Sequence, residues 1–171
     1  AIGAYADPER FQKWWPASYH LVGKDILTFH TVYWFSMLMA QNLPLPTVYA
    51  HGWWMVRNQK MSKSTGNVVS PNLLIDAYGT DAVRYFLLRD IPFGNDGEFE
   101  HAQFLARYNA DLANDLGNLA HRTLSMTEKW LEGKIGPPGP EEGNDASLRT
   151  LAEQVVLRFD QNLQTLQFHS A

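Results

Sequence analysis

The segment NQKMSKSTGNVVSP, residues 58–71, combines charged and hydroxyl-bearing side chains in a pattern that suits anion binding. Lys60 and Lys63 stand three residues apart. Ser62 directly precedes Lys63, and Ser64 directly follows it. The small residues and the glycine of this segment leave the backbone easy to bend, so amide N–H groups and two ammonium groups can converge on one polyanion, such as a phosphate chain. A solvated basic turn is the alternative, and the spacing leaves it open.

Two short apolar runs precede this loop and are predicted to be β-strands. They are YHLVG, residues 19–23, and TVYAHGWW, residues 47–54. Between them, apolar residues recur at helical spacing and predict a helix over residues 24–41. A strand, a helix and a second strand within about 35 residues predict a βαβ unit with parallel strands.

The predicted βαβ unit places several polar residues at one edge of a sheet. Ligands of parallel sheets bind at the carboxyl ends of the strands. This rule brings Gly23, Lys24 and Asp25 to the same rim as the loop after Trp54. Asp25 is equally suited to stabilising the N-terminus of the following helix, and the residues alone leave both readings open.

Two short helices are predicted after the lysine loop. Ser70 and Pro71 have the residue types of an N-cap and a first helical residue, and Gly79 is expected to end that helix. Thr80 is then expected to cap a second helix over residues 81–90.

The remainder of the chain has the pattern of a helix bundle. Residues 92–102 are rich in turn formers and predict a boundary. From His101 to Trp130, apolar residues recur at steps of three and four and predict one long helix. Residues 132–145 form a Pro/Gly linker, and residues 148–166 predict a further helix. We expect that last helix to be cut off without a cap at the end of the chain, as in a fragment of a longer protein.

The composition is that of a globular protein, and its net charge gives no overall electrostatic attraction to nucleic acid. Its 171 residues are 45% hydrophobic and carry a formal net charge of −4, so any nucleic-acid partner must be held by local cationic groups. The absence of cysteine from the sequence excludes disulfides and a cysteine-ligated zinc site. No apolar run has the length of a membrane span. We therefore expect a cytoplasmic protein that uses no membrane.

Two segments resemble the signatures of a known enzyme family. KMSKS, residues 60–64, resembles the second signature of class I aminoacyl-tRNA synthetases, and HLVGKDILTFHTVYW, residues 20–34, is similar to the strand-to-helix segment of methionyl-tRNA synthetases. Leucyl, isoleucyl, valyl and cysteinyl enzymes share the lysine loop but carry other residues in place of GKDI and the FH after it. Residues 81–97 and 109–122 also resemble the family's continuation. The resemblance thus covers nearly the whole chain and favours methionine.

The resemblance implies an α/β fold. A Rossmann-like parallel-sheet half-domain is expected, followed by a mostly helical stem-contact region and the first helices of an α-helical bundle. Residues 1–98 would form the C-terminal part of the catalytic domain, with the lysine loop and the stem-contact region, and residues 99–171 the start of the anticodon-binding bundle. None of the six histidines forms the family's His-x-Gly-His signature. The chain alone is therefore expected to be inactive, as part of an enzyme.

The family joins L-methionine to ATP, which is used with Mg²⁺, and passes the methionyl group to tRNA(Met). The resemblance implies that no metal is bound by this segment. It also implies that Lys60, Ser62, Lys63 and Ser64 form the catalytic loop. The two lysines would stabilise the charge that grows on the departing pyrophosphate, which favours the transition state over bound ATP.

The resemblance assigns ATP binding to two segments. Gly23 and Asp25 match positions beside the adenosine, where glycine permits close backbone approach and a carboxylate can accept hydrogen bonds from ribose hydroxyls. Lys60, Met61 and Lys63 match the loop positions that face the phosphates.

The resemblance assigns the methionine pocket to one stretch of helix. Ile26, Phe29, His30 and Trp34 match the lining positions, and Ile26, His30 and Trp34 follow one another at a spacing of four. Aromatic and imidazole rings suit the soft sulfur of methionine. Read without the family, the same stretch is a core helix with one satisfied histidine. Phe35 stands where the family usually has proline.

On the long helix, NLAHR, residues 118–122, resembles the family's anticodon-reading stretch. Asn118 and Arg122 match the two reading positions and lie one helical turn apart. An amide and a guanidinium can read the hydrogen-bonding edges of unpaired bases. A solvated polar face is the plainer reading of these residues.

Three alternatives remain beside the methionine enzyme. A tRNA-binding module derived from a synthetase would need no phosphate-binding lysines, so the intact Lys60 and Lys63 argue against it. A synthetase for another apolar amino acid would share the lysine loop. A kinase-like phosphate-binding protein is disfavoured because the sequence contains no GxxxxGK loop.

Overall fold

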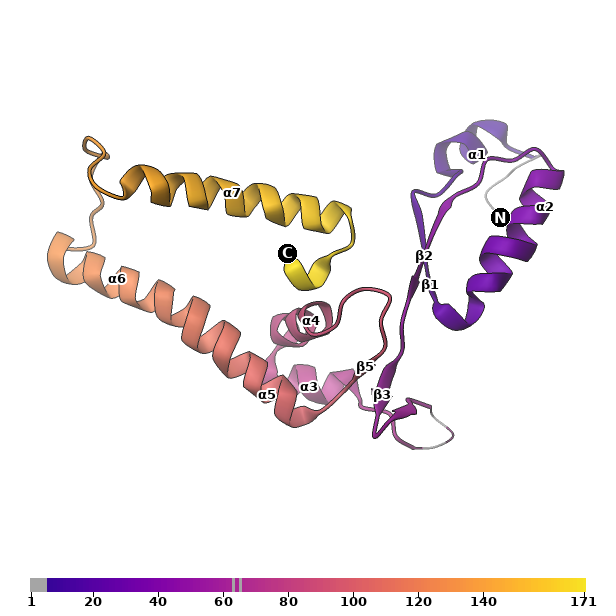
Figure 1. Cartoon of the computed structure of the whole chain (residues 1–171), viewed down its shortest axis with the longest axis horizontal. Coiled ribbons are helices and arrows are strands. Elements are labelled where there is room, and N and C mark those ends of the chain that lie inside the picture. Colours follow the sequence, from indigo (N-terminus) through magenta and orange to yellow (C-terminus); the bar gives the residue numbers. More distant parts are fainter. Residues whose placement is uncertain (1–5, 63, 65) are drawn as a thin grey trace.

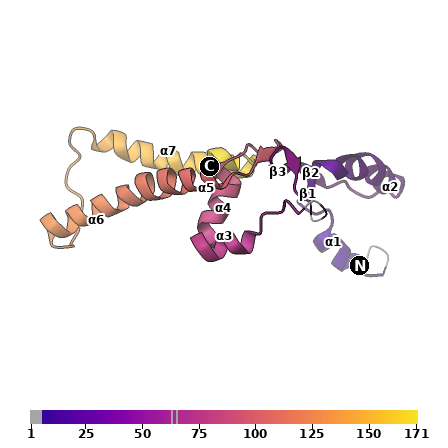
Figure 2. The same ribbon diagram turned by 90° about the horizontal axis from the view of Figure 1, so that it is seen from below.

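The computed structural model describes residues 6–62, 64 and 66–171 and shows an elongated molecule. In Figure 1, one end of the molecule holds the strands β1 (Tyr19–Gly23) and β2 (Thr47–His51) and helix α2 (Trp34–Ala40). Toward the other end extend helices α6 (Asn118–Leu131) and α7 (Asp145–Gln164). Between the two ends lie helices α3 (Pro71–Tyr78) and α4 (Thr80–Arg89). The view from below in Figure 2 keeps this order along the long axis.

A parallel pair of strands forms the first unit. Helix α1 (Pro8–Trp14) leads into β1 (Tyr19–Gly23), and β1 pairs in parallel with β2 (Thr47–His51) from Tyr19↔Thr47 to Gly23↔His51. The prediction of parallel strands joined by a helical crossover is confirmed. Val22 is the buried residue of β1, at 8% exposed.

The crossover itself is not the uniform α-helix that spacing predicts over residues 24–41. It consists of a 3₁₀ turn η1 (Lys24–Ile26), a π-helical segment η2 (Phe29–Tyr33) and the α-helix α2 (Trp34–Ala40). His30 Nδ1 donates to the carbonyl of Ile26 at 2.9 Å, and Thr31 Oγ1 donates to that of Leu27 at 2.9 Å. These side chains compete with backbone N–H groups for the same carbonyls, which favours the wider turn.

The prediction of a single strand over residues 47–54 is wrong. Strand β2 ends at His51, and β3 (Trp54–Val56) begins a separate sheet. Strand β3 pairs antiparallel with β4 (Gln59–Lys60) and in parallel with β5 (Gly97–Glu98). The extended segment is interrupted at Gly52, where a Cβ would lie 2.0 Å from the carbonyl oxygen of Asn95. The predicted boundary at residues 92–102 therefore also contributes a strand.

Helices α3 (Pro71–Tyr78) and α4 (Thr80–Arg89) follow the lysine loop as predicted. Ser70 holds the N-cap position of α3 in an extended conformation, and Pro71 is the first helical residue. The expectation that Thr80 caps α4 is wrong. Gly79 occupies that position with φ 86°, a left-handed conformation that glycine adopts readily, and it turns the chain directly from one helix into the next.

An aromatic core lies where α4, β3 and the segment after β5 meet. Phe86 of α4 packs edge-on against Phe99 and Phe104, with ring centroids 5.8 Å and 5.2 Å apart. Trp54 of β3 packs on Phe86 at 5.7 Å. Phe86 and Phe104 are each 1% exposed. This core joins the sheet that carries Lys60 to the start of the long helix.

The long helix predicted from His101 is confirmed. It runs through α5 (His101–Arg107), a π-helical segment η3 (Tyr108–Gly117) and α6 (Asn118–Leu131) without a break. The predicted linker follows, and α7 (Asp145–Gln164) is the next helix.

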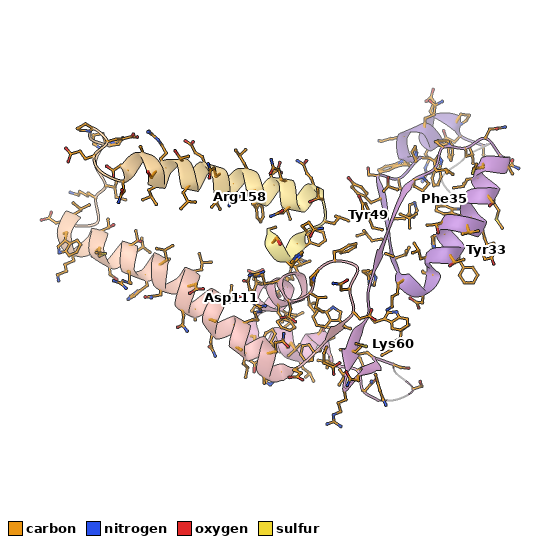
Figure 3. All side chains as sticks on the ribbon, in the orientation of Figure 1. Tyr33, Phe35, Tyr49, Lys60, Asp111 and Arg158 are labelled. Carbon is orange, nitrogen blue, oxygen red and sulfur yellow. The ribbon has the colours of Figure 1, made fainter. Side chains whose placement is uncertain are left out.

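Partly exposed polar contacts join the C-terminal end of α4 to this long helix. The carboxylate of Asp90 accepts hydrogen bonds from Gln103 at 2.9 Å and from Arg107 at 3.3 Å. Asp111 accepts from Arg107 at 3.4 Å and from the hydroxyl of Tyr85 at 2.9 Å. Asp111 is labelled in Figure 3 on the helix beside α4. These contacts set how the helix leaves the core.

The last helix is not cut off at the chain end. Helix α7 ends at Gln164, and Leu166 has φ 59°, so the chain reverses into the 3₁₀ turn η4 (Phe168–Ser170). Phe168 packs edge-on against Phe93 at 5.8 Å, and Arg89 donates to the carbonyl of His169. The expected uncapped helix is wrong, because periodic apolar spacing does not register a reversal that tertiary contacts stabilise.

Candidate active site

The end of β1 and the start of the lysine loop meet at one rim. Lys60 Nζ lies 3.1 Å from Asp25 Oδ2, and about half of each side chain is exposed, 48% for Lys60 and 47% for Asp25. Figure 3 shows Lys60 near the end of the sheet at which β1 leads into the crossover. Residues from two segments that are 35 positions apart in the sequence thus share one ion pair.

A tryptophan that the sequence reading did not single out lies at the centre of this rim. The Nζ atoms of Lys24 and Lys60 lie 4.2 Å and 4.4 Å from the centroid of the Trp53 ring. The indole N–H of Trp53 points to Asp25 Oδ1 at 3.4 Å. Lys24 also forms an ion pair with Asp96. Two lysines and two aspartates are therefore arranged around one ring.

Both aspartates of the rim have lowered pKa values. The hydrogen bond from Lys60 is the main reason that the pKa of Asp25 falls below 3.8, and its own backbone N–H and the Trp53 indole add to it. The hydrogen bond from Lys24 lowers the pKa of Asp96 in the same way, followed by the backbone N–H of Trp53. Each carboxylate is therefore ionised at neutral pH and holds a lysine at the rim.

Gly23 ends β1, and its lack of a side chain leaves room for the Asp25 carboxylate. A Cβ at this position would lie 2.6 Å from Asp25 Oδ1 and 3.8 Å from His51 Cε1. A larger residue would displace the Asp25 carboxylate from its present partners. Gly23 therefore permits the compact turn that places Asp25 at the rim, and the adenosine contact of both residues stays a prediction.

An asparagine closes the lysine loop. Asn67 Oδ1 accepts from the backbone N–H of Ser62 at 2.8 Å, and Asn67 Nδ2 donates to the carbonyl of Lys60 at 3.2 Å. The hydroxyls of Ser62 and Ser64 lie 2.8 Å apart. These contacts hold both ends of a tight loop together. Lys63, the main catalytic residue that the resemblance implies, lies outside the described residues.

Met61 points away from the exposed side of the loop. It is half-buried against the aromatic core. With Trp54, Val69, Val83 and Phe99 among its neighbours, it lines an apolar cavity of about 230 Å³. The side chain of Met61 thus anchors the loop, and its predicted place in ATP binding rests on its backbone position.

The residues predicted for the methionine pocket lie along the crossover. The His30 and Trp34 rings are 5.7 Å apart at an interplanar angle of 78°. Ile26 and Phe29 are more exposed, at 41% and 61%. The structure thus brings His30 and Trp34 together and leaves the outer part of the stretch open.

Three further ring-bearing residues lie around Trp34. Trp34 also packs edge-on against Trp15 at 5.7 Å and against His20 at 5.0 Å. Trp15 is fixed by a hydrogen bond from its indole N–H to the carbonyl of Pro44 at 3.0 Å. Phe35 follows Trp34 in the helix with its ring 6.3 Å away. Trp34 is therefore the centre of an aromatic group drawn from the C-cap of α1, from β1 and from the crossover.

Asn118 and Arg122 lie on the exposed surface of α6, far along the molecule from the rim (Figure 1). They line a shallow groove together with neighbouring residues of the same helix, namely Asn114, Asp115, Leu119, Thr123 and Met126. The two side chains share one open face, which is what a contact with unpaired bases needs. Their anticodon role stays a prediction.

Sequence reasoning missed Trp53, Asp96, Asn67, Trp15 and His20. One signal was present for Trp53, because adjacent residues of an extended segment face opposite ways. With Trp54 in the core, its neighbour must face outward. Asn67 carried the turn preference of its residue type. For Asp96, 72 residues from Lys24 in the sequence, no local signal exists.

The described residues offer neither a metal site nor a membrane-spanning helix. No group of three or more His, Asp or Glu side chains in the described ranges is placed to hold a metal ion. No helix in the part of the chain that the structure describes is long and apolar enough to cross a membrane.

The parallel β1–β2 unit, the lysine loop at its rim and the helical segment that follows define the scaffold of a class I tRNA synthetase. The family model described as "tRNA synthetases class I (M)" matches residues 2–124. Relatives and solved structures agree with this match. The chain belongs to the methionyl-tRNA synthetase family.

The curated relatives described next are longer than this chain. "Methionine--tRNA ligase" of Caldanaerobacter subterraneus subsp. tengcongensis is 50% identical over 164 residues, which are 95% of this chain and 26% of the relative. The protein of the same name from Bacillus subtilis is 50% identical over 165 residues, 95% of this chain and 25% of the relative. The chain thus spans about a quarter of the length of these curated relatives.

Solved structures agree over nearly the whole chain. Mycobacterium tuberculosis methionyl-tRNA synthetase in complex with methionyl-adenylate has a TM-score of 0.88 at 44% identity, over 98% of this chain and 33% of that one. The free form of the M. tuberculosis enzyme has a TM-score of 0.84 at 39% identity, over 98% of this chain and 32% of that one. The α/β fold class predicted from the sequence is confirmed by this likeness.

Proposed function

We propose that the longer protein to which this chain corresponds activates methionine. It joins L-methionine to ATP, releases pyrophosphate, and transfers the methionyl group from methionyl-adenylate to tRNA(Met). The observation that carries the proposal is the contact between Asp25 and Lys60 at 3.1 Å. It joins the two signature segments, GKDI and KMSKS, at one rim.

The residues of the two signature segments have proposed tasks in adenylate formation. Gly23 and Asp25 bind the adenosine, with the Asp25 carboxylate accepting hydrogen bonds from the ribose. Lys60 and Lys63 stabilise the negative charge that grows on the departing pyrophosphate. Ser62 and Ser64 shape the loop, and their hydroxyl groups donate hydrogen bonds to phosphate oxygens. The reaction is then favoured because these cations bind the transition state more strongly than they bind ATP.

Mg²⁺ is proposed to enter with ATP, because phosphate oxygens supply ligands that this ion prefers. The proposed site for the methionine side chain is the aromatic group around Trp34, with Ile26, Phe29 and His30 along its edge. Soft sulfur packs well against aromatic rings, which supports this placement. The proposed compartment is the cytoplasm, where bacterial protein synthesis takes place.

The second half of the chain has a proposed task in tRNA recognition. Residues 1–98 are proposed as part of the catalytic domain and residues 99–171 as the start of the anticodon-binding bundle. Asn118 and Arg122 read the anticodon of tRNA(Met) in this proposal. The exposed shared face of α6 supports it, because amide and guanidinium groups there are free of competing partners on neighbouring helices of the described chain.

Amino-acid-dependent ATP–pyrophosphate exchange by the full-length protein tests the proposal. Methionine should support exchange, and leucine, isoleucine, valine and cysteine should not. Exchange with one of those four instead would identify a synthetase for another amino acid. Absence of exchange together with intact tRNA binding would identify the non-catalytic tRNA-binding module.

The isolated 171-residue chain is proposed to be inactive in the same assay. Its sequence contains no His-x-Gly-His signature, and the positioning of both reactants accounts for roughly 7–11 kcal/mol of catalysis in favourable cases. Exchange by the purified chain well above that of its Lys63→Ala variant would contradict this.

A further inference from the structure

Trp53 is fixed in place more firmly than a loop residue usually is. Its backbone N–H donates to Asp96 Oδ1 at 2.8 Å, and its carbonyl accepts from the N–H of Gly97 at 2.9 Å. Directly before it, Gly52 packs on the backbone of Asn95 so closely that a Cβ would not fit. The backbone of Trp53 therefore has little freedom, and its ring is a rigid part of the rim.

The ring of Trp53 contacts cations from two segments. Lys24 Nζ lies 4.2 Å and Lys60 Nζ 4.4 Å from the ring centroid, both well within the reach of a cation–π interaction. Lys24 has a second partner in Asp96, and Lys60 has a second partner in Asp25. Each ammonium group is thus held by one carboxylate and by the shared ring.

The present partners of Asp25 compete with its proposed task for the same carboxylate oxygens. Its Oδ2 is taken by Lys60 at 3.1 Å, and its Oδ1 faces the indole N–H at 3.4 Å. Ribose hydroxyls that bind this carboxylate compete with Lys60 for it and weaken the ion pair. After that change, the Trp53 ring is the remaining group in the described structure that holds the Lys60 ammonium at the rim.

A ring also differs from a carboxylate in how it holds a cation. A carboxylate cancels the charge of the ammonium group, which weakens the attraction between that group and a phosphate. The face of an aromatic ring attracts a cation through its quadrupole and carries no net charge. Lys60 on the Trp53 ring therefore keeps its full charge for the pyrophosphate.

We propose that Trp53 is a positioning residue that holds Lys60 at the rim when Asp25 turns to the substrate. This inference rests on the proposed function, because the pyrophosphate-forming step is where a positioned Lys60 acts. The ring of Trp53 acts through Lys60 and not on the reacting atoms.

Three variants of the full-length protein test the positioning role in pyrophosphate exchange. Trp53→Leu should lower kcat by about 3- to 30-fold, the range that corresponds to loss of one cation–π contact, while KM for methionine stays unchanged. Trp53→Phe keeps a ring face without the indole N–H and should recover most of the loss. Trp14→Leu is the matched control, because Trp14 is 58% exposed and pairs with Lys13 at 5.3 Å outside the rim.

Equal kcat values for Trp53→Leu and Trp14→Leu would overturn the proposal. So would a Trp53→Phe variant that is no better than Trp53→Leu, because that outcome points to volume or folding and not to the ring face. Thermal unfolding of each variant separates loss of folded protein from loss of positioning. Absence of exchange by the wild type would refute the proposed function and the positioning role with it.

A second measurement needs no catalysis. Reductive methylation with formaldehyde and borohydride, followed by mass spectrometry, measures how readily each lysine amine reacts. In an Asp25→Asn background, where the ring is the remaining holder of Lys60, adding Trp53→Leu should speed methylation of Lys60 several-fold. Lys13 and Lys129 should react at the same rate in both proteins. Equal Lys60 rates would refute the contact between Trp53 and Lys60, whatever the exchange assay shows.

Discussion

At the residue scale, one carboxylate links the two halves of the rim. Asp25 lies in η1, directly after β1, and forms an ion pair of 3.1 Å with Lys60 of β4. Both side chains are about half exposed, which keeps the energy of the pair small and lets it exchange partners. An exchangeable ion pair suits a site whose groups must turn to a ligand.

The pKa of Asp25 provides a test of this pair at low pH. Because Lys60 lowers that pKa below 3.8, the pair stabilises the folded protein at pH values above about 4, and the contribution is lost as the pH falls through the lowered pKa. Lys60→Met should raise the pKa of Asp25 toward its ordinary value, as followed by carboxyl NMR. The free energy of unfolding of Lys60→Met should be lower than that of the wild type near neutral pH, and the two values should converge in acid. An unchanged Asp25 titration would show that Lys60 is not its partner in solution.

Lys63 is expected to matter for chemistry more than for binding. Lys63→Ala in the full-length protein should slow adenylate formation by roughly 100- to 1000-fold, by analogy with removal of one transition-state donor. Methionine affinity should stay nearly unchanged, because the pocket lies on the crossover. Pre-steady-state measurement of adenylate formation, with Lys13→Ala as the control, checks this. Loss of methionine binding with a normal activation rate would make the loop a structural element.

At the element scale, the close packing of the β2–β3 turn on residues 95–96 holds the rim together. The Cβ of Gly52→Ala would lie 2.0 Å from the carbonyl oxygen of Asn95, and backbone atoms cannot move aside cheaply. The substitution should cost about 1–3 kcal/mol of stability, the usual cost of overpacking. Gly136→Ala is the matched control, because nothing lies within 4 Å of its added Cβ. Equal thermal unfolding midpoints for the two variants of the full-length protein would contradict the packing.

The elements that sequence reasoning predicts correctly are those with strong local patterns. Strand β1, helices α3 and α4, and the long helix follow from apolar periodicity and from residues such as Pro71 and Gly79. The π-helical turn at His30 could not be predicted, because side-chain hydrogen bonds to the backbone decide it. The break at Gly52 and the reversal at Leu166 depend on tertiary contacts that periodicity does not register.

The same distinction applies to the candidate site. Lys60 and Asp25 lie in recognisable segments, and the βαβ rule places both at one rim. Trp53 and Asp96 act through contacts with distant residues, so neither stands out in the sequence. Met61 belongs to the recognisable loop, yet only packing shows that its side chain faces the core.

Helix α6 is the element that carries the predicted anticodon contacts. Asn118→Ala or Arg122→Ala in the full-length protein should weaken tRNA charging by about 1–3 kcal/mol per lost base contact. Methionine-dependent exchange without tRNA should stay intact, because the rim is distant from α6 (Figure 1). Charging of tRNA(Met) and of a tRNA with one altered anticodon base measures the effect. Unchanged discrimination between the two tRNAs would mean that Asn118 and Arg122 belong to a solvated face without an anticodon contact. Equal loss in both assays would indicate a destabilised helix.

At the scale of the whole molecule, much apolar surface is uncovered. Large side chains on α6 and α7 are among the most exposed, for example Leu124 at 69% and Val156 at 68%. Exposed apolar faces of this extent are typical of surfaces that pack against other protein. The chain spans about a quarter of its curated relatives, and we expect the remaining three quarters of such a protein to cover these faces.

The most direct test is a structure of the full-length protein with bound methionyl-adenylate. The expected result places the ribose hydroxyls within about 2.6–3.2 Å of the Asp25 carboxylate. The methionyl side chain should lie against His30 and Trp34, and Lys60 should have left Asp25 while remaining over the Trp53 ring. An adenylate bound away from this rim, or an Asp25 still paired with Lys60 and without a ribose contact, would contradict the assignment of this site.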